Sequence, residues 1–201
     1  MCYALSFTGG ATLKWFRDNF SKDKSYAQLD SSVKDNPSGI MILPHFAGAA
    51  NPYMDNSSKA AMLGLTLEHT DADIYKALME GVTYEIMINI EHLESFGIKL
   101  NKLFATGGGA SSDVWLQIKA DILNRPVTAL IAKEAGACGT CMMTGVAIGL
   151  FKDLYEAKSV FVKEKKTFVP DCNKVEKYQK YYKAYKKIYD AVRPIIADVD
   201  K

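Results

Sequence analysis

Three consecutive glycines, Gly107, Gly108 and Gly109, lie between an apolar stretch and the start of an amphipathic helix. The apolar stretch, residues 102–106, predicts a strand, and Ser112 stands where an N-cap residue is preferred. Glycines let the backbone turn tightly and let a ligand approach without a Cβ in the way. The exposed amides of a helix start suit a phosphate. The run therefore indicates either a ligand-binding turn or a turn that serves packing alone, and the motif does not decide between them.

Predicted strands and helices alternate along the chain, which favours an α/β architecture with parallel strands joined by right-handed crossovers. The predicted strands are residues 2–8, 40–43, 61–67, 102–106 and 127–131. The predicted helices are residues 11–20, 26–34, 71–96, 112–123, 136–151, 154–163 and 173–192. No linker separates two folded units, so the sequence predicts one domain.

Two of these helices have particular sequence signals. Thr70 opens the longest one, with Asp71 and Asp73 in its first turn, and Gly97 ends it as a glycine at C′ does. The stretch 136–151 carries no charge but is too short and too rich in glycine and threonine to cross a membrane. We expect it to be a buried helix.

Composition excludes several classes of protein. The chain has 201 residues, of which 48% are apolar and 24% charged, as in an ordinary globular domain. A net charge of +2 makes no electrostatic case for nucleic acid or a membrane surface. With few cysteines and no secretory signal after Met1, we expect a cytoplasmic protein.

Cys138 and Cys141 have the Cys-x-x-Cys spacing of redox centres. They lie within the uncharged helix among small and apolar residues, where buried cysteines act as small hydrophobes. Packing explains them better than thiol redox chemistry does.

The C-terminal stretch 152–187 is rich in lysine and tyrosine, a combination also found in nucleic-acid-binding segments. Its apolar residues, however, recur at alternating spacings of three and four, which predicts one buried helix face with lysines on the solvated side. The stripe consists of Val175, Tyr178, Tyr182, Tyr185, Tyr189 and Val192. We expect no nucleic-acid partner.

The three histidines, His45, His69 and His92, are too scattered to form a metal site by local spacing. No Walker loop, Rossmann fingerprint, nucleophile elbow or His-Glu-x-x-His pattern is present. No acidic residue is marked by its sequence context as a general base.

Two long runs resemble the C-terminal domain of the FGGY carbohydrate kinases, a family that includes xylulokinase, glycerol kinase and gluconokinase. They are ATGGGASSDVWLQIKADILNRPV at 105–127 and AAMLGLTLEHTDADIYKALME at 60–80. Shorter similarities lie at Leu43–Gly48, at Gly9-Gly10 with Trp15 following, and at Glu134-Ala135. The resemblance extends from Phe7 to about Pro194.

This resemblance implies an actin-like, ribonuclease-H-like ATPase domain with a mixed sheet flanked by helices. It implies ATP and Mg²⁺ as cofactors and in-line transfer of the γ-phosphoryl group to a sugar or polyol hydroxyl by an aspartate base. By motif, Gly10 and Lys14 are expected near the nucleotide. Gly107, Gly108 and Gly109 are expected along the adenosine and α-phosphate, and Ser112 at the base.

The chain departs from the family pattern in two ways. Ala50 stands where the family usually has an arginine. We also expect the opening hairpin and the whole N-terminal sugar-binding domain, with the catalytic base, to be missing. We therefore expect residues 1–201 to be one C-terminal nucleotide-binding domain, with helices at 153–193 packed on it, that is inactive alone. No catalytic or metal-binding residue is assigned to it.

The expected partners are the missing N-terminal domain and a sugar, with a xylulose-like ketopentose as the first guess. An open sheet edge favours pairing with a second copy of the chain, so a homodimer is a further expectation. No membrane partner is expected. The alternative function is a non-catalytic nucleotide-binding or interaction module with the same fold.

Overall fold

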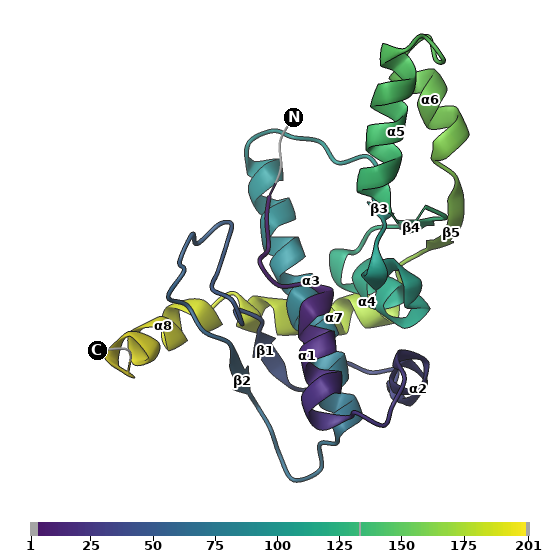
Figure 1. Ribbon diagram of the computed structural model, residues 1–201. Helices are drawn as coiled ribbons and strands as arrows, with labels where there is room; N and C mark the ends of the chain where they lie inside the picture. Colours follow the sequence, from purple (N-terminus) through teal and green to yellow (C-terminus); the bar gives the residue numbers. More distant parts are fainter. Residues whose placement is uncertain (1–3, 133, 200–201) are drawn as a thin grey trace.

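A long central helix organises the chain in the computed structural model, which describes residues 4–132 and 134–199 (Figure 1). The helices are α1 (Gly10–Phe20), α2 (Tyr26–Ser32), α3 (Asp71–Ser95), η1 (Gly108–Ser111, a 3₁₀ helix), α4 (Asp113–Leu123), α5 (Ala135–Ala147), α6 (Leu154–Phe161), α7 (Cys172–Tyr185) and α8 (Ile188–Val199). The strands are β1 (Met41–Leu43), β2 (Ala61–Leu63), β3 (Leu103–Ala105), β4 (Val127–Leu130) and β5 (Glu164–Phe168).

Helix α3 begins and ends where the sequence predicts. The Asp73 carboxylate accepts hydrogen bonds from the Thr70 N–H at 2.9 Å and the Thr70 hydroxyl at 2.7 Å, which forms a capping box. Gly97 follows the helix at φ +79° and donates its N–H to the Glu94 carbonyl at 2.9 Å. These local bonds satisfy the Thr70 N–H and the Glu94 carbonyl, two of the end groups that the intrahelical ladder does not reach.

The strands form two small sheets. β1 pairs with β2 in antiparallel register, and a second sheet has the order β3-β4-β5. β3 and β4 are parallel, as the alternation predicted, and β5 is antiparallel to β4. β5 was not predicted from the sequence, and the predicted strand 61–67 is shorter. The second sheet is therefore mixed.

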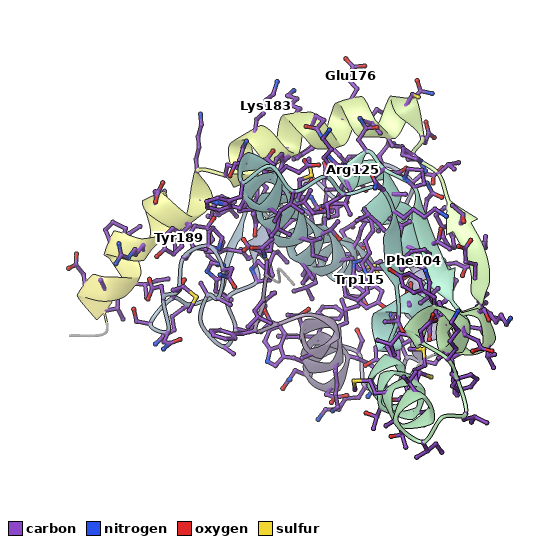
Figure 2. The ribbon with its side chains drawn as sticks, turned by 90° about the horizontal axis from the view of Figure 1, so that it is seen from above. Phe104, Trp115, Arg125, Glu176, Lys183 and Tyr189 are labelled. Carbon is purple, nitrogen blue, oxygen red and sulfur yellow. The ribbon has the colours of Figure 1, made fainter. Side chains whose placement is uncertain are left out.

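The tyrosine stripe of the C-terminal region faces the protein interior. Tyr178 donates to Glu80 at 3.0 Å and Tyr185 donates to Glu85 at 2.7 Å, both on α3. Lys183, on the opposite side of α7, points to solvent (Figure 2). The predicted faces are thus confirmed, but the single predicted helix is two, α7 and α8.

The opening strand predicted at residues 2–8 is wrong for its described part. Cys2 and Tyr3 lie outside the described residues, and residues 4–8 have no regular structure. These residues lie beside the irregular loop after β1. The Leu5 N–H donates to Asn51 Oδ1 at 3.0 Å, and the Asn51 N–H donates to the Leu5 carbonyl at 3.2 Å. Two such bonds do not make a ladder.

The prediction that residues 136–151 form a buried helix is half wrong. α5 is a helix, but it forms with α6 a hairpin that projects from the body (Figure 1). Met143 is 59% exposed and Ile148 is 73% exposed. Cys141 is exposed and Cys138 half-buried, so the expectation that both are buried also fails. Within the described residues, no helix combines the length and the apolar character needed to cross a membrane.

Candidate functional site

The glycine run forms a sharp turn between β3 and α4. Gly107 has φ +81° and ψ −170°, a backbone conformation open essentially only to glycine. The chain then makes one 3₁₀ turn, in which the Ala110 N–H donates to the Gly107 carbonyl at 3.1 Å. We call residues 106–112 the glycine loop.

Both ends of the glycine loop are fixed by side-chain hydrogen bonds. The Thr106 hydroxyl donates to the Ala132 carbonyl at 2.8 Å, which joins the loop to the chain beyond β4. The Ser112 hydroxyl oxygen accepts the Trp115 N–H at 3.0 Å and caps α4, as the sequence predicted. The Ser112 hydroxyl still has its proton to donate, so a ligand can accept a hydrogen bond from it.

The middle of the glycine loop is open. Gly108 is exposed, and a Cβ placed on Gly107 or Gly108 meets no other atom within 4 Å. The backbone there is accessible to a ligand, and α4, which starts directly after the loop, places its N-terminal dipole beside it. The arrangement suits a polar or anionic group laid along the loop.

The second predicted piece of the site is the start of α1. Gly10 is exposed with open space around it, and the Gly9 carbonyl accepts both the Thr12 hydroxyl at 2.8 Å and the Thr12 N–H at 3.1 Å. Lys14 lies one turn on, exposed and ion-paired with Asp18. An exposed pair of this kind is weak, so the lysine can exchange its partner for a ligand anion at little cost.

Helix α3 holds the two pieces on successive turns. Phe16 of α1 packs on Tyr75, with 5.9 Å between ring centroids. Trp115 of α4 donates its indole N–H to the Met79 carbonyl at 3.1 Å. Because Met79 follows Tyr75 by one helical turn, α1 and α4 contact successive turns of α3. The sequence motifs did not reveal this role of Trp115, because its indole bonds to a helix that is distant in the sequence.

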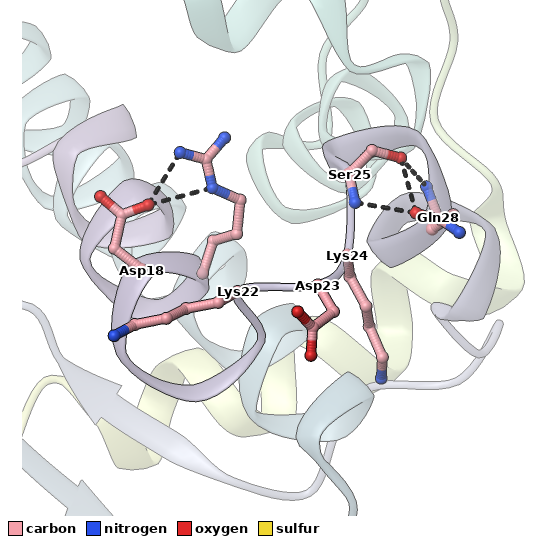
Figure 3. Close-up of a pocket in the computed structure, with 7 residues that line it drawn as sticks. Asp18, Lys22, Asp23, Lys24, Ser25 and Gln28 are labelled. Atoms are coloured by element: carbon pink, nitrogen blue, oxygen red, sulfur yellow. Dashed lines mark hydrogen bonds and ion pairs between the residues drawn. The ribbon is translucent and has the colours of Figure 1, made fainter.

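A hollow of about 480 Å³ lies elsewhere, between the end of α1 and the start of α2 (Figure 3). Two of its cations are already paired, Arg17 with Asp18 at 2.8 Å and Lys24 with Asp71. Ser25 and Gln28 in its wall form a capping box, in which the Ser25 N–H donates to Gln28 Oε1 at 2.8 Å. Because local structure uses these groups, the hollow is a weaker candidate than the glycine loop.

The buried acids of α3 form a separate, structural cluster. Burial raises the pKa of Glu80 to about 7, although the Ser38 hydroxyl donates to it at 2.6 Å and Lys76 lies 4.0 Å away. His45 is also buried, 3.6 Å from Glu85, and packs against Tyr53. It is therefore part of the packed interior. Within residues 4–132 and 134–199, no group of three or more His, Cys, Asp or Glu side chains is arranged to hold a metal ion.

Comparison with known proteins identifies relatives along nearly the whole chain. The model of the FGGY family of carbohydrate kinases, C-terminal domain, matches residues 3–148. A xylulose kinase of Staphylococcus epidermidis is 30% identical over 98% of this chain and 41% of its own length. A glycerol kinase of Pseudothermotoga lettingae is 34% identical over 92% of this chain and 38% of its own length. The chain thus spans about two fifths of these relatives.

Solved structures agree with the sequence relatives. The crystal structure of xylulose kinase from Rhodospirillum rubrum superposes with a TM-score of 0.83 at 26% identity, covering 96% of this chain and 40% of that one. Plasmodium falciparum glycerol kinase with ADP shares the fold at a TM-score of 0.72 and 22% identity, over 89% of this chain and 36% of that one. These matches confirm the predicted actin-like ATPase fold, a mixed sheet flanked by helices.

Proposed function

Since the chain belongs to the FGGY family of carbohydrate kinases as a C-terminal domain, we propose that it is the ATP-binding half of a sugar kinase. The enzyme transfers the γ-phosphoryl group of ATP to a sugar or polyol hydroxyl. The observation that carries the proposal is the open glycine loop, which leads into the N-terminus of α4 in a chain of this family.

Each site residue has a role that its geometry permits. Gly107 supplies the turn, and Gly108 leaves the backbone open along the adenosine and α-phosphate. Ser112 retains a hydroxyl proton to donate to the base. Gly10 leaves the start of α1 accessible, and Lys14 brings a positive charge to the phosphates. ATP supplies the phosphoryl group, with Mg²⁺ as the metal expected on its phosphates.

The catalytic base and the sugar contacts belong, in this proposal, to an N-terminal domain. The relatives are more than twice as long as this chain, which leaves room for such a domain. Xylulose is the first substrate to test, because the name xylulose kinase recurs among the sequence relatives and the solved structures. A cytoplasmic setting is part of the same proposal.

We propose that α7 belongs to the same domain as α3. Lys174 on α7 pairs with Asp35 at 2.8 Å, and Tyr178 and Tyr185 reach Glu80 and Glu85 on α3. These bonds support a single nucleotide-binding domain that includes α7, whereas α6, in the expected range 153–193, lies in the projecting hairpin.

The alternative is a nucleotide-binding module without catalysis. Ala50, where the family usually has an arginine, is only 5% exposed, so a small buried side chain replaces a long charged one in the loop after β1. This change favours either altered chemistry or altered substrate choice.

Calorimetric titration of the chain with Mg-ATP and Mg-ADP tests nucleotide binding. We expect binding, weakened in Lys14→Ala and unchanged in Lys22→Ala, which removes an exposed lysine just beyond the other end of α1. Absence of binding at millimolar nucleotide would overturn both functions.

Kinase activity is tested with the chain joined to its N-terminal domain and a panel of ketopentoses and polyols. Phosphorylation of one of them supports the kinase. Nucleotide binding without turnover on the entire panel favours the non-catalytic module.

A further inference from the structure

The three glycines of the glycine loop differ in what surrounds them. The backbone conformation at position 107, with φ +81°, requires a glycine. Gly108 has open space where a Cβ would stand. A Cβ on Gly109, in contrast, would lie 2.9 Å from Cζ3 and 3.3 Å from Cε3 of Trp115. At Gly109 the glycine is therefore needed because of a side chain of this protein.

The Trp115 ring cannot move aside easily. It is 2% exposed, and its indole N–H donates to the Met79 carbonyl at 3.1 Å and to Thr83 Oγ1 at 3.2 Å. The ammonium group of Lys119 lies over the ring, 4.2 Å from its centroid. The ring is thus held by α3 and by the following turn of α4.

The backbone of Trp115 is bound to the same loop. Its N–H donates to Ser112 Oγ at 3.0 Å. Trp115 therefore bonds to the N-cap residue of α4 through its backbone and contacts the loop before α4 through its ring. A shift of the ring would move Gly109 directly and Ser112 through the cap.

We propose that Trp115 is a positioning residue, which sets the conformation of the glycine loop for nucleotide by contact with Gly109. This rests on the proposed nucleotide-binding function. In this proposal two of the glycines have different roles. Gly109 leaves room for the Trp115 ring, and Gly108 leaves room for the ligand.

Suppression between two substitutions tests the proposal. Gly109→Ala drives the loop off the ring, and we expect it to weaken Mg-ADP binding at least about tenfold. Trp115→Phe deletes the outer ring carbons that the new methyl group meets. The double variant is then expected to bind within about threefold of wild type. Gly108→Ala is the matched control, because its loss of binding comes from the ligand side and is not restored by Trp115→Phe.

Titration calorimetry gives the affinities, and thermal unfolding of each variant without nucleotide separates folding from positioning. Gly109→Ala is expected to lose affinity while remaining folded at the temperature of the titration. If it unfolds there, the titrations of Gly109→Ala and of the double variant are repeated at a lower temperature at which both are folded.

Fluorescence supplies a readout that a purely structural role would not change. The chain has two tryptophans, so Trp15→Phe leaves Trp115 as the reporter. Mg-ADP is expected to shift its emission, and Gly109→Ala to abolish that shift.

The outcomes separate the two proposals. If wild type binds no nucleotide, the proposed function fails and the positioning role falls with it. If wild type binds but Trp115→Phe does not restore affinity to the Gly109→Ala variant, only the positioning role is overturned. An emission that nucleotide leaves unchanged also overturns it.

Discussion

The α3 body (α1–α4, β1, β2 and α7) and the α5–α6 hairpin are both rich in apolar residues, but the hairpin leaves many of its large apolar side chains exposed. Leu78 on α3 is 0% exposed, whereas Met143 on α5 is 59% exposed. α3 packs against α1, α2, α4 and β1, and its Tyr84 ring lies 4.9 Å from that of Tyr185 on α7, whereas the main neighbour of α5 is α6. An apolar pattern therefore predicts that a helix forms, but its burial depends on surfaces that other elements supply.

Truncation of one apolar side chain in each region gives the largest expected difference. Leu78→Ala should reduce the free energy of unfolding by about 2–5 kcal/mol, because it leaves a cavity in a closed core. Ile148→Ala should change it by less than about 0.5 kcal/mol, because Ile148 is 73% exposed. Urea denaturation measures both. Equal losses would show that the hairpin is packed as tightly as the body.

The pH dependence of stability probes the buried acid of the α3 body. Burial raises the pKa of Glu80 from its ordinary 4.5 to about 7. The folded state then holds a proton that the unfolded state has lost, so stability falls as pH rises from about 4.5 to 7. The loss attributable to Glu80 is about 2–3 kcal/mol.

Glu80→Gln removes this titration. The unfolding free energy of wild type minus that of the variant should therefore fall as pH rises from about 4.5 to 7. Glu68→Gln, at an exposed glutamate, is the control. Stability curves of wild type and Glu80→Gln that stay parallel between pH 4.5 and 7 would rule out a buried proton at Glu80.

Thiol labelling tests whether the α5–α6 hairpin is open, and the substitution in it has the smallest expected effect on stability. Cys141 is exposed and Cys138 half-buried, so a thiol reagent should modify Cys141 in the folded chain faster than Cys138. Mass spectrometry of the labelled peptides follows both rates. Cys141→Ser should change the free energy of unfolding by less than about 0.5 kcal/mol. Protection of Cys141 in the native chain would contradict the open hairpin and exclude it from redox chemistry.

Local signals in the sequence predicted much of the fold. The helix start at Thr70, the glycine at 97 and the N-cap at Ser112 lie within single helical turns, so residue order alone locates them. The tyrosine stripe was likewise predicted, because helical spacing fixes which residues share a face. These features depend on neighbours in the chain.

The errors concern neighbours in space. The sequence EKKTF of β5 has no apolar alternation and becomes a strand because β4 offers a partner edge. The uncharged sequence of α5 does not tell whether another surface covers it. In the candidate site, the glycine loop was predicted from residue types. The part of Trp115 was not, because the ring reaches α3 by bonds to Met79 and Thr83.

The hydrogen bonds from α7 to α3 also determine the stage of folding at which the core between these helices can form. Tyr178 and Glu80 are 98 positions apart in the chain, and Tyr185 and Glu85 are 100 apart. During synthesis on the ribosome, α3 is complete long before its tyrosine partners exist. Contacts of such long sequence separation slow folding. This part of folding therefore waits until α7 has been translated, and until then the face of α3 that α7 covers is open to chaperones.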